Sequence, residues 1–386
     1  MKIKVFSILL LLNLPLDAKQ YYVSPAGSDS NLGTSSRPFR TIQRAADVVN
    51  PGDTVVVADG MYSNASESGT GSKLVRMTRG GRADEYVTFR SEHKWGAVLD
   101  GLNNTTAEGW TFTSTASYVR VEGFELKGFS DSGFSNWGGG HDLEIAGNNA
   151  HDIGRYCTDT ANGRVGLFVH SGPMLIEQNV IHDIGRYSPG ENGCALLRPY
   201  YQNQDHGIYI DRGNNITIRN NIFYNNRHGW SVHVYPNPVA NLLILNNTFA
   251  FANPWRTGQI LIAAAVTNVR IANNIFYEPN TAAIYFHPAN PTVPGIGAVV
   301  IMNNLSTTNI IQLYGTKSGR AVTSIPGVTC SRNQEYTDPL LVSPSTSDFH
   351  LRNRSPAASV GLPLPEVAND YNGLTRAKPP SIGAYE

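Results

Sequence analysis

The chain has 386 residues, including 37 glycines and 18 tyrosines, and only 16% of its residues are charged, with a formal net charge of zero. Because this length exceeds that of an ordinary single domain, internal repetition decides how the chain is organised. The neutral balance excludes a general nucleic-acid-binding protein, since phosphate contacts require a basic excess.

The N-terminus has the pattern of a secretory signal peptide. Lys2 and Lys4 precede a mainly apolar run that ends at Leu16, and Ala18 supplies a small residue for cleavage. The run is too short to span a membrane, and no other segment of the sequence is apolar enough to do so. We therefore expect a signal peptide over 1–18 and one secreted or periplasmic domain over 19–386, with no membrane partner.

Residues 38–49, PFRTIQRAADVV, are expected to form a helix that caps one end of the domain. The Thr41 side chain can cap its N-terminus, and the apolar residues that follow recur on one side. A strand is expected next, over 53–58. We assign 19–85 to an N-terminal cap region, because an uncovered terminal strand would pair with other chains.

A repeat fixes the organisation of the central region, 86–320. Six segments share an apolar residue, two further positions and then asparagine, and short stretches rich in β-branched and aromatic residues surround them. Strands repeating every two or three dozen residues indicate a parallel solenoid, in which equivalent asparagines stack and hydrogen-bond along the axis. The asparagines of this predicted ladder are Asn148, Asn179, Asn221, Asn247, Asn274 and Asn304.

Two terminal stretches resemble a known superfamily. Residues 21–62, from YYVSPAGSDS to VVADGMY, resemble the N-terminal signature of the pectate-lyase-like right-handed parallel β-helix superfamily. Residues 338–361, followed by DYNG and a terminal SIGAYE, resemble the closing module of exported β-helix proteins, so we assign 321–386 to such a module. The resemblance implies an all-β, right-handed parallel β-helix, and it implies no single activity, because lyases, epimerases, hydrolases and adhesins share this fold.

One strand of each coil can be aligned on a common face. The segments are GLFVHSG (166–172), GIYIDRG (207–213), GWSVHVY (229–235), QILIAAA (259–265) and AIYFHPA (283–289). Alternation then places Trp230 among the inward core residues and predicts two outward rows. One predicted row is His170, Asp211, His233, Ala263 and His287, and the other is Phe168, Tyr209, Ser231, Leu261 and Tyr285.

Long turns before this face are expected to form the walls of a cleft. The sequence HDIGRY occurs at 151–156 and again at 182–187, and insertions follow both copies. Arginine can hold a carboxylate and tyrosine can stack on a sugar, although repeated turn packing explains the two copies equally well. The predicted substrate-binding residues are Arg155, Tyr156, Arg164, Arg186, Tyr187, Tyr200, Tyr201, Asp205, Arg212, Arg227, His228 and Tyr235. Cys157 and Cys194, which follow the two copies, either form a disulfide or remain buried thiols.

The outward residues suit β-elimination at a uronic acid of an acidic polysaccharide or oligosaccharide. No lysine lies between Lys127 and Lys317, which argues against a lysine base in the central coils. A histidine can remove the C5 proton, a tyrosine or second histidine can protonate the leaving oxygen, and an arginine can neutralise the carboxylate. The predicted catalytic residues are His170, Tyr209, Asp211, His233, His206 and Arg198, with Asp211 orienting an imidazole.

Other functions remain open on the same residues. Uronate C5-epimerisation begins with the same proton abstraction, and a glycoside hydrolase would use Asp211 and Asp205 as its carboxylate pair. A carbohydrate-binding or adhesion protein would need only the groove. No cofactor is predicted, and a divalent metal held by His170, Asp211 and His233 is a minor alternative.

Overall fold

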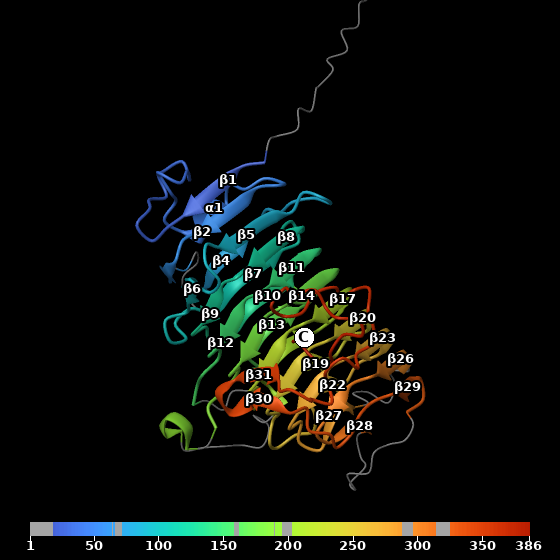
Figure 1. Ribbon diagram of the computed structural model, residues 1–386. Coiled ribbons are helices and arrows are strands. Elements are labelled where there is room, and N and C mark those ends of the chain that lie inside the picture. Colours follow the sequence, from blue (N-terminus) through green and yellow to red (C-terminus); the bar gives the residue numbers. More distant parts are fainter. Residues whose placement is uncertain are drawn as a thin grey trace, which may run out of the picture.

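A computed structural model describes residues 18–63, 65, 72–157, 162–188, 190–194, 203–287, 296–313 and 325–386. The chain forms a right-handed parallel β-helix, and each full coil gives one strand to each of three long parallel sheets (Figure 1). Most of the predicted signal peptide lies outside the described residues. Within them, no helix has the length and apolar character needed to cross a membrane.

Sheet I runs the full length of the solenoid. Its first strand is followed by the short helix α1 (Ile42–Ala46), where the Thr41 side chain accepts a hydrogen bond from the Arg44 backbone N–H, as expected for an N-cap. The eleven strands of sheet I are β1 (Gln20–Val23), β2 (Thr54–Val57), β5 (Val87–Ser91), β8 (Val119–Glu122), β11 (Leu143–Ala146), β14 (Met174–Glu177), β17 (Gly213–Arg219), β20 (Val239–Leu245), β23 (Val266–Ala272), β26 (Ile296–Met302) and β29 (Val328–Ser331).

Sheets II and III complete each coil. Sheet II contains β4 (Lys73–Met77), β7 (Glu108–Thr113), β10 (Ser132–Gly138), β13 (Val165–Val169), β16 (His206–Ile210), β19 (Val232–Val234), β22 (Ile260–Ile262), β25 (Ala282–Phe286) and β28 (Asn309–Leu313). Sheet III contains β3 (Gly60–Tyr62), β6 (Ala97–Asp100), β9 (Glu125–Lys127), β12 (Asn149–His151), β15 (Val180–His182), β18 (Ile222–Tyr224), β21 (Thr248–Ala250), β24 (Ile275–Tyr277) and β27 (Leu305–Ser306).

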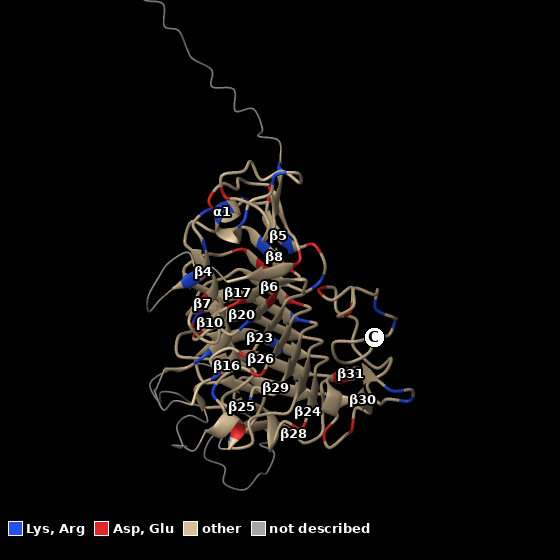
Figure 2. Cartoon of the chain, turned by 90° about the vertical axis from the view of Figure 1, so that its left-hand side faces the viewer, with Lys and Arg blue, Asp and Glu red and all other residues tan. Residues whose placement is uncertain are grey.

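The core consists of inward-facing apolar side chains that stack from coil to coil. In sheet II the stack runs through Val169, Ile210, Val234, Ile262 and Phe286, each paired in register with the next. All five are almost completely buried. Since side chains alternate along a strand, the neighbouring residues of sheet II face outward. Figure 2 shows that basic and acidic positions are scattered along the coils.

The predicted asparagine ladder is confirmed and is one residue longer than predicted. Each side-chain amide donates to the side-chain oxygen of the asparagine in the next coil, at 3.2 Å for Asn148 to Asn179 and 2.9 Å for Asn274 to Asn304. The row continues to Asn333, which accepts from Asn304 at 3.0 Å. Because every buried amide has a partner above or below, these polar side chains are tolerated inside the turn between sheets I and III.

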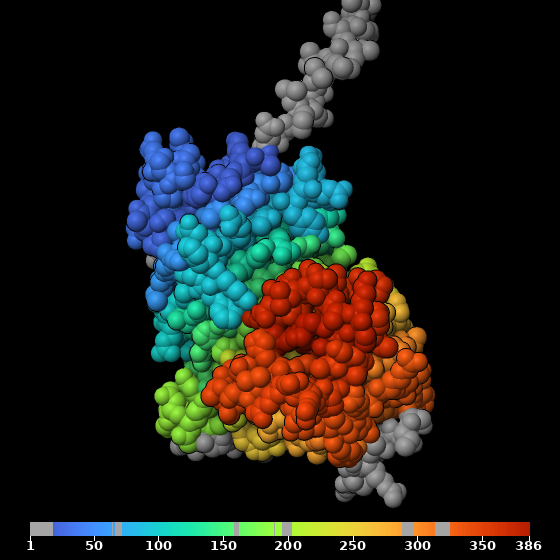
Figure 3. Space-filling view, in the orientation of Figure 1, coloured from blue at the N-terminus to red at the C-terminus, as the bar shows by residue number. Residues whose placement is uncertain are grey.

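A C-terminal module packs against the outside of this turn and covers one side of the coils (Figure 3). It contains the antiparallel strands β30 (Leu341–Ser343) and β31 (Asp348–Leu351), joined by a 3₁₀ turn at Pro344–Thr346. Asparagines that precede ladder asparagines hold it: Asn220 donates to the Asn369 carbonyl at 2.8 Å, and Asn273 donates to the Leu362 carbonyl at 2.8 Å. The face of sheet II is left open on the other side of the solenoid.

Candidate functional site

A groove of about 1000 Å³ crosses the outward face of sheet II, from β4 at one end to the residue after β25 at the other. The strand pairing sets its floor, because residues paired across parallel strands stack in rows. One row, read off the register, is Arg76, Thr111, Ser135, Phe168, Tyr209, His233, Leu261 and Tyr285. The groove therefore lies on the common face for which the sequence predicted two outward rows.

The predicted position of His233 is wrong by two residues. His233 pairs with Tyr209, whereas the sequence alignment placed it beside Asp211. The error comes from matching Gly229 to Gly207. Gly207 packs against the carbonyl of Ser231, so Ser231 is the equivalent residue in the next coil. The inward or outward direction of His233 was nevertheless correct, because a shift of two residues keeps a side chain on the same face.

The predicted core position of Trp230 is also wrong. Its ring lines the groove and packs with Leu261 and Ala263, which are outward-facing residues, in a small cluster separate from the main core. The indole N–H donates to the Thr257 carbonyl at 2.7 Å. Trp230 precedes β19, so the strand alternation on which the prediction rested does not apply to it.

His206 and His233 form a hydrogen-bonded pair at the centre of the groove. His206 Nδ1 accepts from the Trp230 backbone N–H at 3.2 Å, so its proton lies on Nε2, which donates to His233 Nδ1 at 3.0 Å. The remaining hydrogen of His233 is then on Nε2. Gly229 makes room for this arrangement, because a Cβ there would lie 2.4 Å from His206 Nδ1.

Both imidazoles of this pair are held neutral. Burial, followed by the neighbouring His287, lowers the pKa of His233 to about 3. Burial, followed by His233, holds the pKa of His206 well below its usual range. A neutral His233 with its hydrogen on Nε2 offers a hydrogen-bond donor and no free lone pair, so this tautomer suits an acid or a binding group and does not suit a base.

Tyr209 lies in the same part of the groove. Its ring is 5.1 Å from that of His233 and 5.4 Å from those of Phe168 and His206. Burial, together with the negative charge of Asp211, raises the pKa of the phenol well above its usual value. Tyr209 therefore stays protonated and can donate a proton or a hydrogen bond to a sugar oxygen.

His170 and Asp211 form a second pair beside the groove, as the sequence predicted. His170 Nδ1 and Asp211 Oδ2 are 2.7 Å apart, which fixes the imidazole proton on Nδ1 and leaves the Nε2 lone pair available. Asp211 also accepts from Arg212 Nε at 3.1 Å and from the Asn237 amide at 3.0 Å. The His170 ring packs on Trp137 at 4.7 Å, and its side chain is 23% exposed.

The turns expected to hold substrate are mainly packed against one another. Arg186 and Asp205 are 1% and 0% exposed and lie 3.3 Å apart, so their predicted contacts with substrate are wrong, and so is the proposed carboxylate pair of Asp205 and Asp211. Arg155 donates to Glu191 and lies 4.2 Å over the Tyr187 ring. A disulfide joins Cys157 to Cys194 beside the 3₁₀ turn Glu191–Gly193.

The other predicted binding residues divide between the wall and the groove. Tyr156 donates to the Asn104 carbonyl at 3.1 Å, and Arg164 is paired with Asp131 at 3.1 Å. His228 is buried against Ser188, and burial lowers its pKa to about 4. Tyr235 lines the groove, 40% exposed, and stacks on His233, whereas Arg227 is exposed and is not among the groove-lining residues. The predicted residues Arg198, Tyr200 and Tyr201 lie outside the described residues.

Several groove residues escaped the sequence analysis. Lys73 and Arg76 on β4, Glu108 on β7 and Asp131 before β10 all line the N-terminal end of the groove. The central coils contain no lysine between Lys127 and Lys317, but Lys73 lines the same groove from a strand that precedes these coils. Trp137, 63% exposed, is a further lining residue, and its exposed indole provides a surface for sugar stacking.

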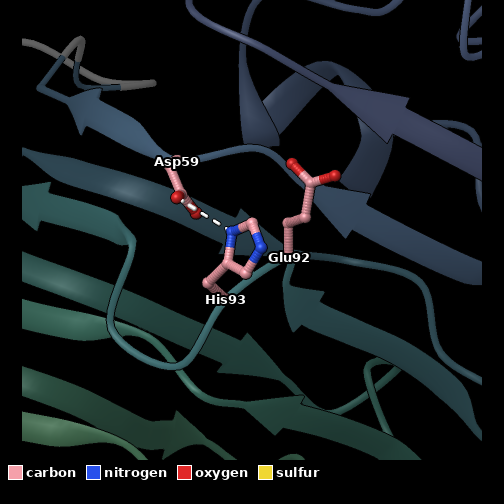
Figure 4. Close-up of side chains that lie close together, drawn as sticks. All are labelled: Asp59, Glu92 and His93. Atoms are coloured by element: carbon pink, nitrogen blue, oxygen red, sulfur yellow. Dashed lines mark hydrogen bonds and ion pairs between the residues drawn. The ribbon is translucent and has the colours of Figure 1, made fainter.

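The three residues of the minor metal alternative do not converge. A metal site needs three or more histidine, cysteine or carboxylate side chains with their ligand atoms close together. In the described part of the chain, one such group has its ligand atoms within 4.8 Å of one another, and it consists of Asp59, Glu92 and His93 (Figure 4). His93 Nδ1 is 2.9 Å from Asp59 Oδ2, and all three residues are exposed. His170, Asp211 and His233 are therefore not arranged to share one ion.

Comparison with known proteins identifies similar families. Residues 21–188 match a family model described as Pel9A-like, right handed beta helix region, and residues 147–320 match one described as periplasmic copper-binding protein (NosD). The uncharacterized protein YwoF of Bacillus subtilis (strain 168) is 24% identical over 330 residues, covering 68% of this chain and 69% of YwoF.

Solved structures share the architecture. Pectate lyase Pel9A superposes with a TM-score of 0.62 at 17% identity, over 95% of this chain and 96% of its own. The alginate lyase from Paenibacillus sp. str. FPU-7 gives a TM-score of 0.52 at 16% identity, over 82% and 95% of the two chains. At these identities the likeness is one of fold, and it confirms the predicted fold class.

Proposed function

We propose that this pectate-lyase-like right-handed parallel β-helix is a secreted polysaccharide lyase that cleaves a uronic-acid-containing polysaccharide by β-elimination. One observation carries the proposal: Asp211 accepts hydrogen bonds from both His170 and Arg212 beside a groove large enough for a sugar chain. A base and a cation for the substrate carboxylate are thereby organised on one side chain.

The reaction follows from the tautomers of the imidazoles. His170 Nε2 takes the proton from C5, the electron pair of that C–H bond forms the C4–C5 double bond, and the bond from C4 to the glycosidic oxygen breaks. Tyr209 or His233 gives a proton to the departing oxygen. Arg212, which is 52% exposed and uses Nε for Asp211, directs its terminal nitrogens to the carboxylate and makes C5 more acidic.

The similar proteins support the general class of enzyme and do not specify the reaction. The two solved structures described above are named as lyases of pectate and of alginate, both built on the same fold. The signal-peptide pattern of residues 1–18 supports a secreted or periplasmic location. One of the two matching family models is described as a periplasmic protein, which agrees with this location.

The test is incubation of the purified protein with a panel of polyuronates, followed by the ultraviolet absorbance of unsaturated uronates. We expect absorbance with at least one substrate and its loss in His170→Ala. His93→Ala is the matched control, because His93 also pairs with an aspartate but lies far along the solenoid from this pair. New reducing ends without absorbance would mean hydrolysis, inversion at C5 without cleavage would mean epimerisation, and either result would overturn the lyase proposal.

A further inference from the structure

Two exposed aromatic side chains line the groove. Trp137, on β10, is 63% exposed, and Tyr235, directly after β19, is 40% exposed. Each ring offers a large apolar surface, and the burial of such a surface by a ligand is favourable. Single aromatic residues are common on protein surfaces, so the position of these two relative to His170 and Asp211 decides what they indicate.

The strand register places Trp137 beside His170. Ser135 of β10 pairs with Phe168 of β13, and Trp137 and His170 each lie two residues further along their segments. The two rings are in contact, with centroids 4.7 Å apart and an angle of 44° between their planes. A second contact, edge-on to the Phe168 ring at 5.2 Å, holds the indole in place. A sugar stacked on Trp137 therefore lies next to the imidazole proposed as the base.

The same row continues to Tyr235 on the other side of the catalytic pair. The Asp211 backbone N–H donates to the Val169 carbonyl at 2.8 Å, and the Tyr235 backbone N–H donates to the Ile210 carbonyl at 3.0 Å. These bonds extend the parallel ladders by one residue beyond the strands. Asp211 therefore follows His170 in the row, and Tyr235 follows Asp211.

The two aromatic residues thus lie at opposite ends of a short row, with His170 and Asp211 between them. Three strand spacings separate Trp137 from Tyr235, which is about 14 Å. One sugar ring cannot cover this distance, so two different sugars of one chain must occupy the two positions. Tyr235 is also held in place, because its ring stacks on that of His233 with centroids 5.7 Å apart and an interplanar angle of 13°.

We infer that Trp137 and Tyr235 are stacking subsites, which bind two sugars of one polyuronate chain on opposite sides of the bond that is cleaved. The inference rests on the proposed function, which supplies the ligand and assigns His170 as the base. An aromatic ring packs against the apolar face of a sugar, and its N–H or O–H can hydrogen-bond to a hydroxyl at the edge. Because the bond breaks between two occupied subsites, cleavage takes place within chains, and short oligomers are poor substrates.

Matched aromatic variants test the two subsites. Trp137→Ala and Tyr235→Ala each remove one ring, whereas Trp137→Phe keeps a ring at the first position. Trp255→Ala and Tyr336→Ala are the controls, because these residues are 39% and 69% exposed and neither is among the described groove-lining residues. Each groove variant should raise KM for long oligouronates about tenfold and keep kcat within about threefold, and Trp137→Phe should recover most of the loss. An unchanged KM, an equal rise in the controls, or a fall in kcat alone, as expected if Trp137 only positions His170, would overturn the subsites.

A binding measurement separates this inference from the proposed function. Calorimetric titration in a His170→Ala background requires no turnover, and the probes are oligogalacturonates and oligomannuronates from dimer to octamer. If the wild type cleaves none of them but Trp137→Ala and Tyr235→Ala still weaken octamer binding about tenfold, the subsites stand and the lyase proposal fails. If the octamer is cleaved but its affinity is unchanged in both variants, or equals that of the dimer, the subsites are wrong and the lyase proposal stands. Failure of every oligomer to bind would overturn both. Thermal unfolding of each variant confirms that it is folded.

Discussion

Asp211→Asn tests the proposed mechanism most directly, because the two side chains have the same shape. The carboxylate accepts from His170 Nδ1 at 2.7 Å and from Arg212 Nε at 3.1 Å through one oxygen, and from Asn237 through the other. An amide has a single oxygen. If this oxygen keeps the Asn237 contact, the new NH₂ group faces two donors, His170 Nδ1 and Arg212 Nε. The imidazole can accept from the NH₂ group only if its own proton moves from Nδ1 to Nε2. Nε2 then has no lone pair to take a proton from the substrate, so the base is lost.

The size of the effect follows from the bond that is lost. A hydrogen bond to a charged group contributes about 1.5–3 kcal/mol, and about 1.4 kcal/mol corresponds to a tenfold change in rate. We therefore expect kcat to fall about 10- to 150-fold, measured by initial rates of unsaturated-uronate formation at saturating substrate. Asp183→Asn is the control, since Asp183 pairs with His182 Nδ1 at 2.6 Å on the side of sheet III. A kcat for Asp211→Asn within threefold of wild type would refute the assignment of His170 as an oriented base.

Three further predictions concern stability. Asn247→Ala removes an amide that donates to three acceptors, including Asn274, and should lower the free energy of unfolding in urea by about 3 kcal/mol. In the control, Asn241→Ala, the exposed amide is removed and the free energy of unfolding should fall by less than about 1 kcal/mol. Equal losses of stability in the two variants would contradict a stabilising role of the ladder. Asp205→Ala leaves the buried Arg186 charge uncompensated and should cost about 3–5 kcal/mol in the same assay, and a cost below about 1 kcal/mol would show that the pair is not structural. The pKa of His233 is about 3 in the folded chain and about 6.5 when unfolded, so its contribution to stability is complete above about pH 6.5 and is lost as the pH falls toward 3. His233→Phe should therefore flatten the dependence of the free energy of unfolding on acid pH. Identical pH profiles for the variant and the wild type would count against a neutral, buried imidazole.

The coil architecture was predictable because it depends on local patterns. Each ladder asparagine follows an apolar residue by three positions, and the structure stacks all six that were predicted. Asn333 was missed because the segment before it, with Cys330 two residues after Val328, has no long apolar run to mark it as a copy. The periodicity of two along each strand correctly sorted inward from outward residues wherever the residue lies inside a strand.

The candidate site was less predictable because it depends on register between distant coils. The pairing of His170 with Asp211 was found, since both follow strands whose second residues, Gly166 and Gly207, are equivalent. His233 was displaced because Gly229 serves a different purpose, which is to leave space for His206. Nothing in the sequence distinguishes these two reasons for a glycine.

The N-terminal end of the groove, lined by Lys73, Arg76, Glu108 and Asp131, was not predicted for a different reason. Its residues come from coils that precede Ile145, where the asparagine repeat begins, so no marker was available to align Lys73 or Glu108 with the central strands. The packing of Arg155 and Arg186 inside the wall also could not be read from HDIGRY, because a repeated motif shows that two turns are alike and does not show which side of the turn faces solvent.

The double asparagines of the repeat explain how the fold keeps its stability separate from this open groove. In Asn246-Asn247 the second residue enters the buried ladder, while the first has a φ of 51° and turns its side chain outward to the carbonyls of Ser381 and Gly383. Asparagine adopts such left-handed conformations more readily than most residues, and its amide can then reach a neighbouring backbone. The same dipeptide thus fixes the coil spacing and binds the C-terminal module on the side away from sheet II. Since both contacts lie outside the groove, groove residues can be exchanged for other chemistry while the coil spacing that aligns them is retained.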